Sequence, residues 1–275
     1  MSNVRAVVTG AANGLGRAFA EELAKDGARL LLSDIEMDTL ETTRRHIASL
    51  GAEVHTTRCD VRNMDDLTRL AAEADDKLGG TDLVINNAGV AVGGPVDEVS
   101  LEDWKWVLDI NLWGVIHGVR AFVPDMKARG AGAVINVASV AGLVHAPQLG
   151  PYNVSKAGVV ALSETLYGEL HGTGVRVTVL CPSFFKTRII ETARGPLGSR
   201  DRGIASVMMD RSKVQANDVA RYALDASARG QLHALPMSDA RMMWRAKRTA
   251  PNWFVRSTAR VVRSKWLGKL TRAGG

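Results

Sequence analysis

Short apolar segments alternate with amphipathic segments along most of the chain, and this alternation restricts the fold more than any other feature. Segments rich in β-branched residues or leucine are predicted as seven strands, at 4–9, 28–33, 52–58, 82–87, 132–139, 175–181 and 232–236. Helical patterns lie between them, at 15–25, 38–50, 64–78, 101–129, 152–171 and 216–229. Strands that are apolar throughout are buried on both faces, as in parallel sheets covered by helices. We therefore predict an α/β fold with a doubly wound parallel sheet of seven strands and helices on both faces.

The alternation ends near residue 238, and this sets the predicted domain boundary. Residues 1–238 are predicted to form one domain, and 239–275 a helical extension. A long interval without a strand, 183–213, is rich in Gly, Arg and Met, which predicts a mobile substrate loop with a helix or two of its own. No segment reaches the 18 or so consecutive apolar residues that a membrane span needs.

The segment TGAANGLG, Thr9–Gly16, lies between the first predicted strand and the first predicted helix. In this position Gly10 permits a tight turn, Gly14 lets the backbone approach a pyrophosphate, and Gly16 lets helix and strand pack closely. The remaining loop residues, Asn13 and Leu15, lead into a helix N-terminus whose amide groups favour phosphate. The segment therefore predicts a dinucleotide site of the Rossmann type.

Asp34 closes the second predicted strand, 18 residues beyond Gly16. A carboxylate at this place accepts hydrogen bonds from the adenosine ribose and repels a 2′-phosphate. Neither Asn13 nor Ile35 supplies a cation there, although Arg17 is close in sequence. We predict NAD as the cofactor in preference to NADP.

Further motifs follow in an order that points to one family. Asp60-Val61 follows the third strand, and Asn86-Asn87-Ala88-Gly89 lies at the end of the fourth. Asn111 lies in a helical pattern, Ser139 lies 13 residues before Tyr152, and Tyr152 and Lys156 have Tyr-x-x-x-Lys spacing. With the glycine segment, these motifs resemble the short-chain dehydrogenase/reductase family over about residues 1–190.

The resemblance implies an NAD(P)-dependent alcohol dehydrogenase or ketone reductase. Tyr152 would exchange a proton with the substrate oxygen, and Ser139 would donate a hydrogen bond to that oxygen. Lys156 would tune Tyr152 and hold the nicotinamide ribose, and Asn111 would anchor a water that leads from Lys156 to solvent. The resemblance also implies that Tyr152 contacts the cofactor, and it adds as further cofactor contacts Asp60, Val61, Asn87, Ala88, Gly89, Pro182 and Thr187.

The spacing of Tyr152 and Lys156 also has a direct physical meaning. Residues four apart on a helix share a face, so the ammonium is expected beside the phenol. A nearby cation favours the phenolate and lowers the pKa of the phenol toward neutral pH, where a general acid or base works best. One departure from the family pattern follows the sixth strand, where Pro182-Ser183 replaces the usual Pro-Gly.

Two segments are expected to shape the substrate site. The loop after Ser183 is apolar, through Phe184, Phe185, Ile189, Met208 and Met209. The segment between Ser139 and Tyr152 offers His145 and Gln148 as polar contacts. We predict a hydrophobic secondary alcohol or ketone as substrate, with His145 and Phe184 in contact with it. The alternative is that these side chains only pack the loop.

The extension carries most of the positive charge. Residues 241–275 hold ten Lys or Arg and no acid, leaving 25 basic against 29 acidic residues in 1–240. An apolar helical stripe is predicted at Val255, Ala259, Val262, Trp266 and Leu270, with Arg256, Arg260 and Arg263 on another face. Such a basic amphipathic helix docks on the acidic body or a partner subunit, or lies on an anionic membrane surface. Nucleic acid is not predicted, because the aromatic residues lie on a packing stripe.

Several predictions concern the setting of the protein. Cys59 and Cys181 lie far apart at the ends of apolar segments, as buried reduced thiols do, and no metal site is predicted. The N-terminus has no signal-peptide pattern, so we expect a cytoplasmic protein, peripheral at a membrane if the extension binds one. A homodimer or homotetramer is expected from the family resemblance. A catalytically silent dinucleotide-binding scaffold or redox sensor stays open as the alternative function.

Overall fold

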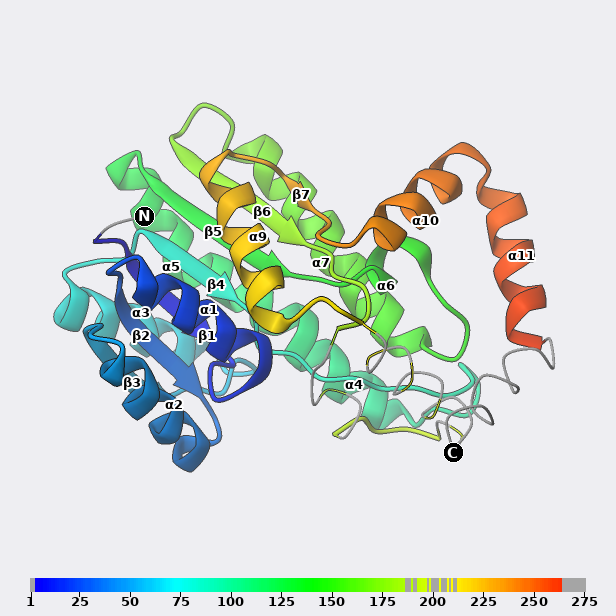
Figure 1. Cartoon of the computed structure of the whole chain (residues 1–275), viewed down its shortest axis with the longest axis horizontal. Coiled ribbons are helices and arrows are strands. Elements are labelled where there is room, and N and C mark those ends of the chain that lie inside the picture. Colours follow the sequence, from blue (N-terminus) through cyan, green and yellow to red (C-terminus); the bar gives the residue numbers. More distant parts are fainter. Residues whose placement is uncertain are drawn as a thin grey trace.

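The computed structural model describes residues 3–185, 189, 192–196, 198, 203, 207, 209 and 212–263, with only the backbone of 261–263. Seven parallel strands in this part form one sheet in the order β3-β2-β1-β4-β5-β6-β7. The strands are β1 (Arg5–Thr9), β2 (Arg29–Asp34), β3 (Val54–Arg58), β4 (Leu83–Asn86), β5 (Gly132–Val137), β6 (Val175–Leu180) and β7 (His233–Ala234). Helices cover both faces of the sheet (Figure 1). The predicted doubly wound α/β fold is confirmed, with each strand within two residues of its predicted ends.

The helices that surround the sheet are α1 (Gly14–Lys25), α2 (Met37–Ser49), α3 (Met64–Leu78), α4 (Leu101–Leu108), α5 (Gly114–Arg129), α6 (Ala141–Val144), α7 (Gly150–Glu169) and α9 (Ala216–Ala228). The single helix predicted over 101–129 contains a π-helical turn, η1 (Asp109–Trp113), between α4 and α5. The short helix α6 was not predicted, because four residues are too few to show a helical period.

Successive side chains along a strand pack into two hydrophobic cores, one on each face of the sheet. Val8, Leu32 and Ile85 face the core that includes α1 and α9. Val7 and Leu31 face the core formed with α3 and α5. Since successive side chains of a strand point to opposite faces, an apolar strand serves both cores at once. This accounts for the uninterrupted apolar segments in the sequence.

The carboxyl ends of the parallel strands meet along one edge of the sheet. The change of direction in strand order falls between β1 and β4, which pair directly with Val7 opposite Val84. Ligands of doubly wound folds bind in the crevice outside this point. The segments that follow β1, β2, β4, β5 and β6 therefore supply the candidate site.

The C-terminal extension forms two helices, α10 (Ser238–Thr249) and α11 (Pro251–Arg263), and not one. The break falls at Ala250, because the residue before a proline disfavours the helical conformation. Figure 1 shows α11 beyond α10, away from the sheet. On the predicted stripe Val255 is 55% exposed, Phe254 beside it is buried, and Trp266 and Leu270 lie outside the described residues. None of the helices described here is long and apolar enough to cross a membrane.

Candidate active site

The glycine loop after β1 has the geometry that its sequence predicts. Gly10 has a φ of +66°, and a Cβ there would lie 2.7 Å from the Cα of Ala88. A Cβ on Gly16 would overlap the carbonyl oxygen of Gly10, so this position requires glycine for close packing. Gly14 has a φ of +55°, and no atom lies within 4 Å of a Cβ built there. The loop is therefore closed toward the protein and open on the side of Gly14.

Residues after β4 clamp the same loop. The side-chain amide of Asn87 donates to the carbonyl oxygens of Thr9 and Gly10, at 2.9 Å each. The hydroxyl of Thr9 accepts from the backbone amides of Asn87 and Ala88, at 3.1 and 3.3 Å. Asn13, the N-cap of α1, makes no side-chain capping hydrogen bond. The first amides of α1 thus stay free of a capping side chain, which fits the binding of a dinucleotide pyrophosphate at this end.

Asp34 lies against the glycine loop at the end of β2. Its carboxylate accepts from the backbone amide of Ala12 at 2.9 Å, and from those of Ile35 and Glu36 at 2.7 and 3.1 Å. Arg17, the cation that lies close to this site in the sequence, binds a different acid, because its Nε donates to Glu21 at 2.8 Å. The carboxylate is thus directed by backbone groups, and no ion pair of Asp34 occurs among the described residues.

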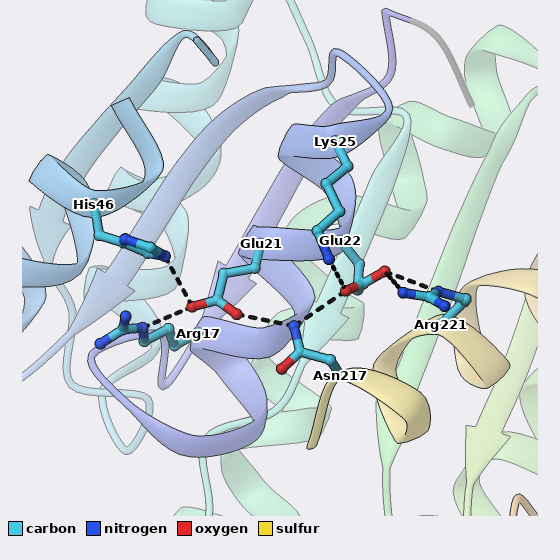
Figure 2. A network of polar contacts seen from close by, with 7 residues as sticks. All are labelled: Arg17, Glu21, Glu22, Lys25, His46, Asn217 and Arg221. Carbon is cyan, nitrogen blue, oxygen red and sulfur yellow. Dashed lines mark hydrogen bonds and ion pairs between the residues drawn. The ribbon is translucent and has the colours of Figure 1, made fainter. Parts of the chain in front are cut away.

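A network of charged residues fastens the glycine-loop helix to its neighbours (Figure 2). Glu21 on α1 binds Arg17, Asn217 of α9 and His46 of α2. Glu22 binds Lys25, Asn217 and Arg221, with Arg221 held through two hydrogen bonds. The network thus joins α1, α2 and α9. Sequence reasoning missed it, although Glu22 interrupts the apolar stripe of α1 that includes Leu15 and Phe19.

Two predicted adenine contacts have other partners in this structure. The Asp60 carboxylate binds the guanidinium of Arg62 through several hydrogen bonds, the shortest 2.6 Å long. This pairing, and not a ligand, is the main cause that holds the pKa of Asp60 below its ordinary value. Val61 is buried, and a Cβ on Gly114 of α5 would lie 2.8 Å from its side chain. Their cofactor contacts stay predictions.

Ser139, Tyr152 and Lys156 lie together at the carboxyl edge of the sheet, near the end of β5. Ser139 follows β5, whereas Tyr152 and Lys156 lie on α7 with the ammonium 5.9 Å from the centre of the phenol ring. The Ser139 hydroxyl lies close enough to the Tyr152 phenol to lower the pKa of that phenol. These residue types in this arrangement can hold a substrate oxygen and move a proton to or from it.

The predicted lowering of the Tyr152 pKa is wrong for this structure. Burial raises the pKa of the phenol above its ordinary value of 10, and the nearby Ser139 hydroxyl offsets only part of this effect. Lys156 is 3% exposed, and its Nζ donates to the carbonyl oxygen of Val137 at 2.9 Å. Burial lowers the pKa of Lys156 to about 8, with a small opposing effect from Cys181, itself a buried free thiol. Both groups are thus pushed toward their neutral forms, because desolvation is the largest cause of each shift.

Asn111 lies in the π-helical turn and is fully buried. Its side-chain oxygen accepts from the amide of Val90 at 2.8 Å, and its NH₂ donates to the Val90 carbonyl and the Ser155 hydroxyl. A Cβ on Gly89 would lie 3.3 Å from both the Asn111 oxygen and the Lys156 ammonium, so all three approach one point. The side chain braces the segment after β4 against α7, and its role in a water chain stays a prediction.

The turn after β6 uses Ser183 in place of glycine. The buried Ser183 hydroxyl donates to Asp239 of α10 at 2.7 Å, and the Pro182 carbonyl accepts from Val140 at 2.8 Å. Phe184 is partly buried. Phe185 was expected to contribute to the apolar loop after Ser183, but it packs in the hydrophobic core. Thr187 and Met208 lie outside the described residues.

His145 ends α6 in a left-handed conformation, halfway between Ser139 and Tyr152. Its Nδ1 lies 2.8 Å from the Nζ of Lys247 on α10, and its Nε2 lies 3.2 Å from the carbonyl oxygen of Gly142. The carbonyl of Gln148 accepts from Gly94 at 2.8 Å, which ties the same segment to the residues after β4. Lys247 was not predicted as a site residue, because the family resemblance ends before the extension.

Comparison with known proteins places this arrangement among dinucleotide-dependent oxidoreductases. A family model described as short chain dehydrogenase matches residues 4–196. A 1-deoxy-11-beta-hydroxypentalenate dehydrogenase of Streptomyces exfoliatus is 35% identical over 243 residues, which cover 87% of this chain and 85% of that protein. The chain belongs to the short-chain dehydrogenase/reductase family.

Two solved structures of the family extend the comparison to the cofactor. A short-chain dehydrogenase/reductase from Burkholderia phymatum in complex with NAD has a TM-score of 0.85 and 36% identity, covering 92% of this chain and 95% of that one. A metagenomic short-chain oxidoreductase in complex with NADP has a TM-score of 0.70 and 28% identity, covering 85% and 96%. Both nicotinamide cofactors therefore occur among similar structures, and this chain is an oxidoreductase of the same family.

Proposed function

We propose that the protein is an NAD-dependent alcohol dehydrogenase or ketone reductase that acts on a hydrophobic secondary alcohol or ketone. The observation that carries this proposal is the meeting of Ser139, Tyr152 and Lys156 at the carboxyl edge of the sheet, where the Lys156 ammonium also approaches Gly89. The relative from Streptomyces exfoliatus is named for a hydroxypentalenate, a hydroxy acid, which supports an alcohol function as the reacting group.

The chain would work by holding the substrate oxygen between two hydroxyl groups. Ser139 donates a hydrogen bond to that oxygen, and Tyr152 takes the proton of an alcohol or returns one to a ketone. The Lys156 ammonium favours the phenolate of Tyr152 by charge attraction, against the burial that disfavours it. NAD or NADH, when bound, supplies the acceptor or donor of hydride. The protein contributes position and electrostatic stabilisation.

The first experiment follows cofactor absorbance with purified protein, NAD or NADP, and a panel of hydrophobic secondary alcohols. We expect Tyr152→Phe to lower kcat by about 10²- to 10⁴-fold, the usual contribution of a general acid or base. NAD binding to the variant should be unchanged. Tyr167→Phe, on the solvent side of α7, is the matched control. Binding of NAD without turnover of any alcohol would favour the silent scaffold.

We propose NAD in preference to NADP because of Asp34. The carboxylate is positioned by three backbone amides, and the nearest predicted cation, Arg17, binds Glu21 instead. Asp34→Ala should narrow the ratio of kcat/KM for NAD over NADP by about 10-fold or more, because a hydrogen bond to a charged group contributes about 1.5–3 kcal/mol. An unchanged ratio would refute this role.

We also propose an oligomeric assembly and a cellular setting for the protein. A homodimer or homotetramer follows from the family resemblance, and analytical ultracentrifugation tests it. A peripheral membrane contact of a cytoplasmic protein is supported by α11, where Trp253 and Val255 are 62% and 55% exposed. Flotation with vesicles containing anionic lipid tests this contact. A Trp253→Ser variant should float less, and equal flotation would contradict the proposal.

A further inference from the structure

We propose that Lys247 of α10, together with His145, forms an anion site at the rim of the substrate site, so that the substrate carries a carboxylate several carbons from the reacting alcohol. This inference rests on the proposed function and deepens it. It assigns a recognition role to a helix outside the segment that the family model matches.

The contacts of Lys247 leave one of its donors free. Its Nζ donates to the carbonyl oxygen of Leu143 at 2.7 Å and to the Nδ1 of His145 at 2.8 Å. An ammonium has three N–H groups, so these contacts use two of them. Because Nδ1 of His145 accepts, Nε2 carries the proton and points to the Gly142 carbonyl. The imidazole is thereby held neutral and oriented.

The positive charge of Lys247 lacks a counter-ion. In the part of the chain described here, no carboxylate pairs with it, and its two partners are neutral. The side chain is partly buried, and this burial lowers its pKa. Burial and the proximity of Lys247 likewise lower the pKa of His145, so the imidazole adds no charge. A partly desolvated ammonium without a counter-ion is unfavourable, and an anionic ligand would compensate it.

Other basic side chains of α10 have different surroundings. Arg241 donates to the carbonyl oxygens of Leu235 and Pro236, and Arg248 lies over the Trp244 ring at 5.2 Å. Arg245 is exposed to solvent. Lys247 therefore differs from them in reaching the segment between the two catalytic hydroxyl groups.

The pair of Lys247 and His145 is connected to Ser139 and Tyr152 through α6 and the segment that follows it. α6 begins two residues after Ser139, His145 follows its last residue, and α7 carries Tyr152. A helix of four residues advances about 6 Å. At its other end α10 is attached to the turn after β6, through Asp239 and Ser183. A carboxylate at Lys247 would thus lie some distance from an alcohol held by Ser139 and Tyr152, as in an extended apolar hydroxy acid.

The test compares matched pairs of substrates with and without charge. We would measure kcat/KM with NAD for hydroxy acids of increasing chain length and for their methyl esters, using the wild type and Lys247→Met. The wild type should prefer the acid, and Lys247→Met should raise KM for the acid by about 10- to 100-fold, as expected for a charged hydrogen bond. For the esters, kcat/KM should differ by no more than about twofold between the wild type and Lys247→Met. The same limit should hold for kcat with both the acids and the esters. Lys247→Arg should recover part of the preference, and Arg245→Met is the control on the same helix.

A binding measurement makes the result independent of turnover. Decanoate in the presence of NAD should raise the melting temperature of the wild type and not that of Lys247→Met, whereas decanol should act equally on both. An equal loss for acid and ester in Lys247→Met would overturn the proposal, since it indicates a purely structural contact with α6. If no alcohol is oxidised, the proposed function fails, while the decanoate shift still decides the anion site.

Discussion

Lys156 and the network of Glu21 and Glu22 both contain buried charge, but in the part of the chain that the structure describes only the charges of the network have partners of opposite charge. Lys156 is 3% exposed, has no acidic partner among the described residues, and donates to a backbone carbonyl. Glu22 is 6% exposed but accepts from Lys25, Asn217 and Arg221. Burial pushes the pKa of Lys156 down to about 8. Burial also raises the pKa of Glu22, but its hydrogen-bond partners outweigh this and hold the pKa below 4.5.

This difference separates structural charge from charge that is available for chemistry. The acids of the network are compensated within the fold, so they fasten α1 to α2 and α9. The ammonium of Lys156 is uncompensated, so it costs stability and is free to act on the Tyr152 phenolate. Groups with pKa values shifted by burial are common in active sites for this reason.

The largest effect is expected for Lys156→Met, which removes the buried ammonium. The pKa change from 10.5 to about 8 corresponds to about 3 kcal/mol, and loss of the hydrogen bond to Val137 offsets about 1 kcal/mol. Without cofactor the variant should therefore be more stable than the wild type by about 2 kcal/mol at pH 7, although inactive. Urea unfolding measures this.

The same variant also has a pH signature. Because the folded-state pKa lies below the unfolded one, the unfolded wild type binds more protons between about pH 8 and 10.5. In this interval the free energy of unfolding of the wild type therefore rises with pH, whereas that of Lys156→Met does not. The variant should exceed the wild type in stability by the full amount below pH 8, and this difference should shrink above pH 8. A variant that is less stable than the wild type at pH 7 would mean that the ammonium is compensated.

An intermediate effect of the opposite sign is expected for Glu22→Gln. Its basic partners are half exposed, which weakens each ion pair, so we expect a loss of about 1 kcal/mol at pH 7. Since the folded pKa is lowered, the contribution is present above the ordinary value of 4.5 and is lost as the pH falls through the folded pKa. Glu41, which is more exposed and pairs with Arg44, is the control, and Glu41→Gln should lower the free energy of unfolding by clearly less than Glu22→Gln. If Glu22→Gln and Glu41→Gln lowered the free energy of unfolding equally, the network would stabilise the fold no more than an exposed ion pair does.

The smallest effect is expected for Asn217→Ala, which deletes the amide that bridges the two acids. Asn217 donates to Glu21 at 2.8 Å and to Glu22 at 3.0 Å. We expect a loss of about 0.5–1 kcal/mol in thermal or urea unfolding. The double variant with Glu22→Gln should lose less than the sum of the single losses, because both changes remove one shared interaction. Additive losses would show that the acids are held independently.

Local sequence patterns predicted much of the fold and of the cofactor side. The strands follow from uninterrupted apolar segments, and the glycine loop follows from Gly10 and Gly16, where any side chain would overlap the backbone. The spacing of Tyr152 and Lys156 placed both on one helix. These features depend on residues close together in the chain, or on a backbone conformation that few residues adopt.

Features that join distant segments were missed. The link from Glu22 to Arg221 spans 199 residues, and the contact of Lys247 with His145 spans 102. The expected lowering of the Tyr152 pKa was wrong because it considered the nearby cation and not the burial of both groups. The stripe predicted from Val255 onward begins within α11, and the separate helix α10 before Pro251 was not predicted.

The sequence by itself determined the order of strands and helices and the conformation of the glycine loop, since hydrophobic periodicity and local sterics specify them. Motif spacing supplied the proposed catalytic side chains. Only the tertiary structure decided which charges are compensated, where α10 lies against α6, and how far the Lys156 pKa is lowered. Those properties depend on desolvation and on partners brought together by packing, which sequence spacing does not encode.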